Sequence, residues 1–226
     1  MSRVCVMLGE GKSERAFFES LLVNKLGFTE TQKNTIFLSK DEQVYWVFPL
    51  PGYGSTHSGG YKLYQNPLTF YKAQAMLRNS EWQIGKYPEL HYVVLLDVDT
   101  CAEDQLNDRE TKTREAFEIA AVTHSTFDIN FSKIEIESWF LAGLTVDYPY
   151  LASSAKSSVL KYSTKDPDAI HDPKEVLDSL LLPEVAGSRQ RIGRDMGEHI
   201  NLSQAIDRSA SLAYFISSLR GKNLID

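Results

Sequence analysis

Length, composition and charge exclude several classes of protein. The chain has 226 residues, of which 42% are hydrophobic and 24% charged, and 24 Lys+Arg against 30 Asp+Glu give a formal net charge of -6. This apolar content allows enough burial to offset the entropy lost on folding, which argues against disorder. The acid excess argues against a protein whose whole surface coats nucleic acid, but it does not exclude a local binding site.

The sequence also predicts where the protein works. No segment reaches the roughly 18–20 uninterrupted apolar residues that a membrane helix requires, and the first residues contain no apolar run of signal-peptide length. Cys5 and Cys101 are too few for a disulfide framework and too isolated for a metal or redox motif. We therefore expect a soluble, cytoplasmic protein that does not associate with a membrane.

The start of the chain alternates apolar runs with helical patterns. Residues 4–8 form a continuous apolar run, and the apolar spacing over 13–26 predicts a helix directly after it, with Ser13 as its N-cap. Residues 44–48 predict a second strand, and a loop rich in Gly, Pro and Ser follows over 49–60. This order of strand, glycine turn and helix is typical of α/β proteins.

The same alternation continues through the middle of the chain. A helix is expected over 67–82, and residues 91–96 are apolar throughout, as in a strand buried on both faces of a parallel sheet. Residues 110–121 predict a helix, 126–131 a fourth strand, and 134–141 the start of another helix. The buried stripe of the first of these helices is expected to consist of Leu68, Tyr71, Ala75 and Met76. The inward-facing residues of the last are expected to be Ile134, Trp139 and Leu141.

A change in composition predicts two regions. Residues 1–145 are expected to form an α/β domain with a parallel sheet of about four strands flanked by helices. After residue 145 the chain becomes rich in Ser, Lys, Asp and Pro, and helical patterns then recur over 174–182, 189–198 and 203–219. We expect residues 146–226 to form a mainly helical extension packed on the first domain.

Two carboxylates directly follow the third predicted strand. Residues two apart on a strand point to the same side, so Asp97 and Asp99 are expected to project together. The carboxyl ends of strands face the ligand crevice of an open parallel sheet. Adjacent carboxylates repel each other unless a cation or a proton neutralises them. The pair therefore indicates a Mg²⁺ site, although acids that simply begin a solvated loop give the same pattern.

Other charged residues are placed to join this site. Glu10 follows the first strand within a glycine turn, where it would share one sheet edge with the two aspartates if the first and third strands are neighbours. Glu135 and Glu137 open the helix after the fourth strand, and because residues two apart do not face one another on a helix, we expect at most one of them to reach the site. Glu137 is the preferred residue, and Glu135 is the alternative. Lys12 and Arg15 are candidate phosphate contacts, and solvated surface charges are the alternative.

Two other kinds of site find little support. Residues 11–13 match the end of a nucleotide-binding P-loop, but the first glycine of that motif would fall at Val6, inside a strand. The 5 histidines have no spacing typical of zinc ligands.

Two segments resemble the Toprim domain: G-E-G-K-S-E-R-A-F-F after the first strand and L-L-D-V-D-T at the end of the third. Two more, I-E-I-E-S-W-F-L-A after the fourth strand and I-D-R-S-A-S-L-A-Y-F in the helical tail, resemble one group of Toprim-like proteins. The Toprim fold occurs in topoisomerases, primases, OLD-type nucleases and small bacterial proteins tied to phage defence, and the chain is most similar to that last group. The likeness covers residues 3–142 in pattern.

The resemblance implies a function and a set of site residues. Glu10, Asp97 and Asp99 match catalytic and Mg²⁺-binding positions, for which Mn²⁺ is an alternative metal, and Glu137 matches a further acidic ligand of nuclease-like members. The implied activity is metal-dependent cleavage of nucleic acid, with DNA as the favoured substrate and RNA as the alternative. Relatives often work with an ATPase partner protein, and a homo-oligomer is compatible with the sequence.

Three alternatives stay open at this point. A D-x-D glycosyltransferase would use Asp97 and Asp99 to hold a metal and a nucleotide-sugar, but it leaves Glu10 without a role. A phosphatase of the haloacid dehalogenase type requires D-x-D-x-[TV], and Cys101 occupies its fifth position. The third alternative is a Toprim-like binding subunit without catalytic activity.

Overall fold

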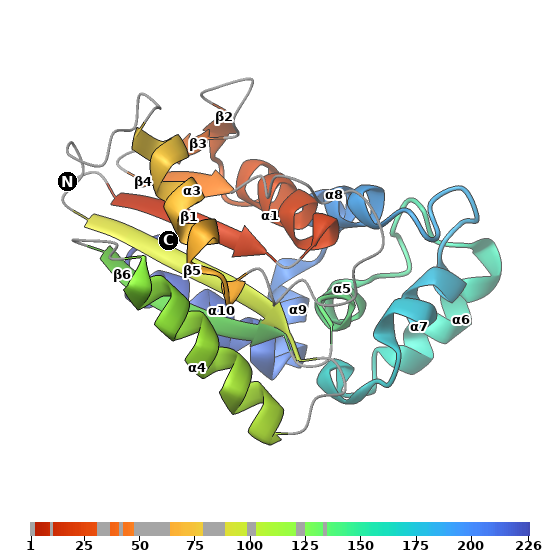
Figure 1. The fold of residues 1–226 in the computed structure, drawn as a ribbon. Coiled ribbons are helices and arrows are strands. Elements are labelled where there is room, and N and C mark those ends of the chain that lie inside the picture. The colour runs from red at the N-terminus through yellow and green to blue at the C-terminus, as the bar shows by residue number, and fades with distance from the viewer. Residues whose placement is uncertain are drawn as a thin grey trace. The chain divides into compact units, whose positions relative to one another are not determined.

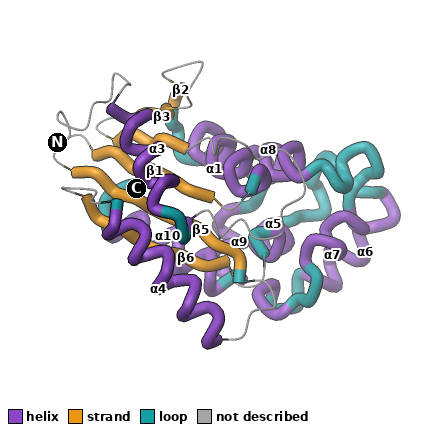
Figure 2. Tube along the Cα trace, viewed as in Figure 1, coloured by secondary structure: helices purple, strands orange, loops and turns teal. Residues whose placement is uncertain are grey.

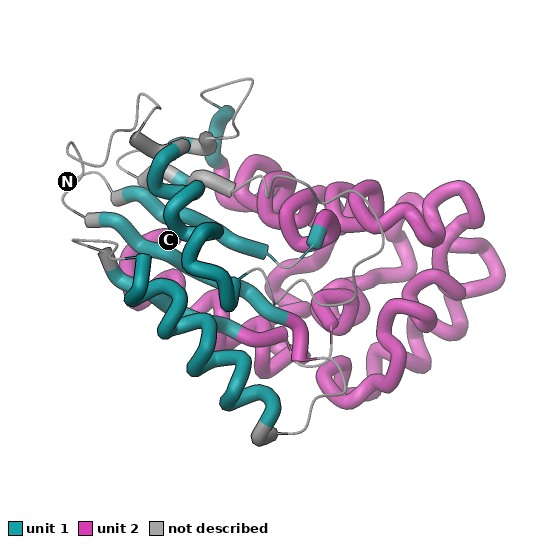
Figure 3. The backbone as a smooth tube through the Cα atoms, in the orientation of Figure 1, with its two compact units in different colours: residues 1–11, 28–96, 100–130 teal, residues 12–27, 97–99, 131–226 magenta. Residues whose placement is uncertain are grey.

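The computed structural model gives the fold of most of the chain (Figures 1 and 2). It describes residues 3–9, 11–30, 37–40, 43–47, 64–78, 89–98, 103–120, 125–132 and 135–226. The chain forms two compact units, coloured separately in Figure 3. Unit 1 comprises Met1–Gly11, Phe28–Leu96 and Thr100–Asn130, and unit 2 comprises Lys12–Gly27, Asp97–Asp99 and Phe131–Asp226. The domain boundary expected at residue 145 rests on composition and stays a prediction.

The strands form one sheet with the order β2-β3-β4-β1-β5-β6. They are β1 (Arg3–Gly9), β2 (Thr29–Glu30), β3 (Phe37–Lys40), β4 (Gln43–Val47), β5 (Glu89–Asp97) and β6 (Ser125–Ser132). β1 pairs in parallel with both β4 and β5, so that Cys5 lies opposite Tyr45 on one side and His91 on the other. The expected α/β class with neighbouring first and third strands is therefore confirmed for β4, β1 and β5.

An antiparallel edge completes the sheet. β3 pairs with β4 and with β2 in antiparallel directions. The sequence did not predict β2 and β3, because strands of 2 and 4 residues are too short to show an alternating pattern.

Helices α3 (Pro67–Arg78) and α4 (Glu103–Ile119) pack on one face of the sheet through an aromatic cluster. The Phe70 ring centroid lies 5.4 Å from that of Phe117 and 5.8 Å from that of Phe127. The predicted buried stripe of α3 is wrong, because Leu68 is 58% and Tyr71 45% exposed whereas Phe70 is fully buried. The helix carries two apolar faces, and the aromatic cluster decides which of them is buried.

Helix α4 also begins earlier than the sequence predicted. It starts at Glu103 instead of residue 110, so an acidic stretch before the predicted start is also helical. The exposed acids are held by cations one turn away, as in the 2.6 Å ion pair of Asp108 with Lys112 and the 3.1 Å pair of Glu110 with Arg114. Such i,i+4 pairs stabilise a helix that lacks a strong apolar pattern.

Unit 2 consists mainly of helices. They are α1 (Lys12–Asn24), α5 (Glu137–Gly143), α6 (Lys156–Tyr162), α7 (Pro173–Leu180), α8 (Arg189–His199), α9 (Leu202–Arg208) and α10 (Ala210–Gly221), with 3-10 turns η2 (Ser153–Ala155) and η3 (Pro167–Ala169). No helix in the described part of the chain has the length and apolarity needed to span a membrane.

The predicted bounds of these helices need two corrections. Ser13 is not the N-cap of α1, because the helix begins at Lys12 and Ser13 is buried within its first turn. The single helix expected over 203–219 is two helices, since Ser209 between them is extended (φ -106°, ψ 111°) and its side chain accepts a hydrogen bond from the Leu212 amide. A serine that caps a new helix ends the preceding one.

Helices α1 and α8 approach each other closely along a line of glycines. A Cβ atom at Gly193 would overlap the Ser13 carbonyl and lie 3.2 Å from the Phe17 amide nitrogen, and one at Gly197 would lie 2.5 Å from the Phe17 carbonyl oxygen. Gly193 therefore faces the start of α1 and Gly197 a point one turn further along. The two helices consequently run in the same direction.

Aromatic rings fill the core of unit 2. The Phe17 and Phe140 centroids are 5.0 Å apart, and Phe215 lies 5.4 Å from both Phe18 and Trp139. Trp139, one of the residues predicted to face inward, is fully buried. These contacts connect α1, α5 and α10.

Candidate acidic site

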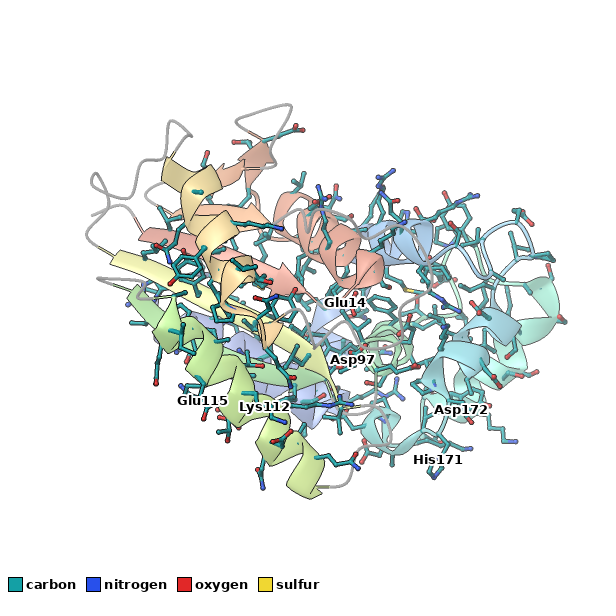
Figure 4. The ribbon with its side chains drawn as sticks, viewed as in Figure 1. Glu14, Asp97, Lys112, Glu115, His171 and Asp172 are labelled. Atoms are coloured by element: carbon teal, nitrogen blue, oxygen red, sulfur yellow. The ribbon has the colours of Figure 1, made fainter. Side chains whose placement is uncertain are left out.

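Asp97 is the last residue of β5 and is anchored to the end of β6. Its Oδ1 atom accepts a hydrogen bond from the Ser132 hydroxyl, and the Val98 amide donates to the Ser132 carbonyl at 3.1 Å. Asp97 itself is half-buried, and Figure 4 labels it at the end of its strand. Ser132 therefore fixes the orientation of the Asp97 carboxylate, a contact that the sequence alone did not suggest.

Glu135 and Glu137 closely follow Ser132, the hydrogen-bond partner of Asp97, along the chain. Glu135 lies three residues after Ser132, so their Cα atoms are at most about 11 Å apart. Glu135 is half-buried just before α5, and Glu137 is the first residue of that helix, 5% exposed. Glu135 acts on the charge of Glu137, so both residues belong to one cluster, and the preference for Glu137 over Glu135 stays a prediction.

Glu137 is a buried carboxylate beside an arginine. Its Oε1 atom lies 3.6 Å from Nη1 of Arg189. Burial raises the pKa of Glu137, Arg189 opposes that shift, and the neighbouring Glu135 adds to it. The net direction shows that desolvation outweighs the attraction of the guanidinium. A further cation at this position would favour the ionised carboxylate.

Asp178 holds Arg189 in place. It forms a close ion pair with Nη2 of Arg189, and its other oxygen accepts a hydrogen bond of 3.1 Å from the Gly187 amide. Asp178 thus orients both the guanidinium and the segment that leads into α8. No sequence signal pairs Arg189 with α5 or α7.

The first turns of α1, α5 and α8 meet at one end of unit 2. α1 and α8 run in the same direction, and so do α5 and α8, because Glu137 faces Arg189 at their starts and the Asn201 amide donates to the Gly143 carbonyl at their ends, 3.1 Å away. Helix N-termini carry partial positive charge, which favours carboxylates. The fold therefore supports acidic side chains at this end.

Glu14 is a second buried carboxylate that sequence reasoning missed. It lies in the first turn of α1 and is 4% exposed, and Figure 4 labels it on that helix. Its place in the first turn of the predicted helix, where Asp and Glu are favoured, was a signal that could have singled it out. Glu14 adds to the negative charge that the starts of these helices support.

The two candidate phosphate contacts differ in their surroundings. Lys12 is exposed at the first position of α1. Arg15 is half-buried, and its Nε donates to Glu19 at 2.6 Å, which offsets much of its charge. Lys12 is therefore the better placed of the two for an external phosphate.

Glu10 and Asp99 lie outside the described residues. β1 ends at Gly9, opposite Leu95, which is two residues before Asp97. The buried Tyr64 hydroxyl donates a hydrogen bond to the Gly9 carbonyl. The end of β1 is thus tied down one residue before Glu10, by a tyrosine that no sequence pattern identified.

The described carboxylates have the chemistry of ligands for a hard cation such as Mg²⁺, but they do not complete a coordination shell. Within the described ranges, no three His, Cys, Asp or Glu side chains are grouped so that they could hold a metal ion. Two of the four proposed ligands, Glu10 and Asp99, fall outside those ranges. Asp97 and Glu137 offer the carboxylate oxygens that Mg²⁺ prefers.

The described residues define an α/β protein with carboxylates gathered where strands end and helices begin. Comparison of the chain with protein-family models, with curated proteins and with solved structures finds no match. The function proposed for it rests on its own residues.

Replacing Glu137 by glutamine is expected to alter stability in a pH-dependent way. Because burial raises the pKa of Glu137 above its ordinary 4.5, ionisation of this carboxyl costs more in the folded than in the unfolded chain. The cost is absent well below the ordinary pKa, grows as pH rises from the ordinary pKa to the raised one, and is complete above the raised one. Urea denaturation with a chelator, at about pH 4.5 and pH 8, should show the Gln variant gaining stability relative to wild type at the higher pH. An equal difference at both pH values would contradict desolvation as the cause.

Proposed function

We propose that the chain is a Mg²⁺-dependent nuclease or phosphodiesterase of the Toprim type that acts on nucleic acid. The observation that carries this proposal is the hydrogen bond between Ser132 and Asp97. It joins the ends of β5 and β6 three residues before Glu135, and so supports a single acidic site built from segments far apart in sequence. A nuclease needs such convergence, whereas solvated loop acids do not.

The strand contacts support the finer fold assignment. A Toprim-like sheet needs β6 as a fourth parallel strand. The His91 ring contacts the Thr126 hydroxyl at 2.6 Å, and both this pair and the Asp97–Ser132 pair are separated by 35 residues. A constant separation along two neighbouring strands is expected of parallel pairing.

The residues of the proposed site would have different roles. Asp97 and Glu137, with Glu10 and Asp99, would hold the metal, which when bound would polarise a phosphodiester and help to supply the attacking water. Ser132 orients Asp97, and partners of this kind contribute typically 10–100-fold to metal affinity or activity. Arg189 lowers the cost of charging Glu137 in the buried site. Lys12 is exposed where it would attract a phosphate.

The resemblance to phage-defence proteins and the net charge of the chain both suggest a partner protein. A net charge of -6 disfavours tight binding of nucleic acid without help. An ATPase partner protein would supply additional contacts, as in the phage-defence proteins that the sequence resembles. DNA in the cytoplasm is the preferred substrate in this proposal, and RNA is the alternative.

Cleavage of plasmid, linear DNA and RNA in Mg²⁺ or Mn²⁺ tests the proposal. Wild type should cleave at least one of them, and Asp97→Asn should lose activity by about 100-fold or more, because it removes a ligand charge. Asp108→Asn is the matched control, since Asp108 is exposed on α4 and pairs with Lys112. Equal activity of Asp97→Asn and wild type would show that the site is wrong.

One observation favours a second candidate function, a metal-free binding subunit. Arg189, held by Asp178, already places a cation beside the buried Glu137. A structural ion pair of this kind needs no Mg²⁺. If neither nucleic acid is cleaved and Mg²⁺ leaves the melting temperature unchanged, the binding-subunit proposal would be preferred.

A further inference from the structure

A groove lies between the end of α6 and the start of α7. Its residues are distant in sequence from the acids described above. Its lining includes Tyr162, Lys165, Asp166, Ile170, His171 and Val176. The ammonium of Lys165 lies 5.1 Å from the centre of the Tyr162 ring. His171 is exposed where the chain enters α7, as labelled in Figure 4. We call this feature the α6–α7 groove.

The groove borders a basic stretch of the chain. Residues 148–165 contain no Asp or Glu but include Lys156, Lys161 and Lys165. All three lysines are exposed, and none forms an ion pair with a residue in the described ranges. By contrast, Arg15 and Arg191 are both paired with an acid one turn away. Uncompensated lysines in an acidic protein indicate a surface for an anionic partner.

The wall of the groove is fixed from inside the protein. Nη2 of Arg208 donates to the carbonyls of Tyr162 and Lys165, at 2.8 and 3.2 Å. These carbonyls lie at the last residue of α6 and three residues beyond it, and their partial negative charge would otherwise repel an anion. Asp166 accepts a hydrogen bond of 2.9 Å from the Asp168 amide. The positions of Tyr162 and Lys165 are thus set before any ligand binds.

Helix α7 separates the groove from the acidic site. Val176 lines the groove, whereas Asp178 binds Arg189 beside Glu137. Residues two apart on a helix are about 200° apart around its axis, so these side chains leave opposite faces of α7. A helix is about 10 Å across, which is a span of a few nucleotides. One strand could therefore pass from the groove to the acidic site.

We propose that the α6–α7 groove binds the phosphate backbone of a nucleic-acid strand, with Lys165 and His171 as phosphate contacts and the Tyr162 ring as a surface for a base. This inference rests on the proposed function. Aromatic rings beside cations bind single strands by stacking and by charge together. Tyr162 makes no ring–ring contact with a described residue, so a base that displaces the Lys165 ammonium has one face of the ring available.

Fluorescence anisotropy of labelled single-stranded and duplex DNA, with Asp97→Asn as the parent to prevent cleavage, tests the proposal. Lys165→Gln should weaken binding by about 3–10-fold at moderate salt and lower the slope of log affinity against log salt by about 1. Asp166→Asn removes a negative charge from the groove and should tighten binding by about 2-fold. Lys25→Gln is the matched control, because Lys25 is exposed after α1 and should change neither quantity.

The outcomes separate the two proposals. Cleavage by wild type, with equal affinities of the Lys165→Gln and Lys25→Gln variants, would overturn the groove alone. A protein that neither binds nor cleaves any nucleic acid would overturn both. Binding of polyglutamate that depends on Lys165, without binding of DNA or RNA, would replace the nucleic acid by an acidic polypeptide. Circular dichroism melting should show the Lys165→Gln, Asp166→Asn and Lys25→Gln variants to be as stable as the Asp97→Asn parent, because these three side chains are exposed.

Discussion

Gly193→Ala is expected to lower the free energy of unfolding by about 1–3 kcal/mol, because the new methyl group would meet backbone. The added Cβ would overlap the Ser13 carbonyl and lie 3.0 Å from its carbon and 3.2 Å from the Phe17 nitrogen. Backbone in the first turns of α1 cannot move aside as the end of a flexible side chain can. Either α8 shifts away from α1 or the helices lose their packing.

Gly221→Ala is the matched control for this prediction. Gly221 ends α10, and nothing lies within 4 Å of a Cβ at that position. Alanine has a higher helix propensity than glycine, so this variant should be as stable as wild type or gain up to about 1 kcal/mol. Urea denaturation followed by circular dichroism measures both variants. Opposite signs are expected, and a Gly193→Ala protein as stable as wild type would show that α1 and α8 do not touch there.

Asp168→Ala is expected to cost about 3–5 kcal/mol, because it leaves several buried donors without an acceptor. Asp168 is 2% exposed. It accepts hydrogen bonds from the Ser209 and Ser211 hydroxyls, at 2.9 and 3.0 Å, and from the Ser211 amide at 2.9 Å. The Ser211 hydroxyl also receives the Trp139 indole N–H at 2.7 Å. One carboxylate thus connects η3, the start of α10 and α5.

Two further variants make the Asp168 prediction specific. Asp168→Asn keeps the shape of the side chain and one acceptor oxygen, so its free energy of unfolding should lie between those of wild type and Asp168→Ala. Asp207→Ala changes an exposed residue of α9 and should stay within about 0.5 kcal/mol of wild type. Thermal melts and near-UV circular dichroism of Trp139 report the loss of the hydrogen-bond network around Asp168. If Asp168→Ala melts like Asp207→Ala, the network contributes nothing to stability.

Elements with a strong pattern were predicted well. β1, β4, β5 and β6 coincide closely with apolar runs, and α7 and α8 with helical spacing. Prediction failed where local pattern and packing compete. Both faces of α3 are apolar, and only the contact of Phe70 with Phe117 and Phe127 selects the buried one. Ser209, at the break between α9 and α10, donates a hydrogen bond to Asp168, 41 residues away, and no local pattern encodes this contact.

Prediction of the candidate site from the sequence has the same limit. Asp97 was identified because carboxylates at the end of a buried strand are unusual, and strand periodicity makes their direction predictable. Ser132, Arg189 and Asp178 were not identified as members of the site. Each acts through a contact between segments distant in sequence, and their residue types are common on protein surfaces.

The net charge of -6 illustrates what the sequence determines and what the tertiary structure decides. The sequence by itself determined the α/β class, the order of its main elements and the excess of acid, because periodicity and composition are local properties. Only the tertiary structure decided where charge is concentrated. It buries Glu14 and Glu137 in the first turns of helices that run in the same direction as α8, and it leaves Lys156, Lys161 and Lys165 exposed elsewhere. Burial and helix direction depend on packing between distant segments, which no local pattern encodes.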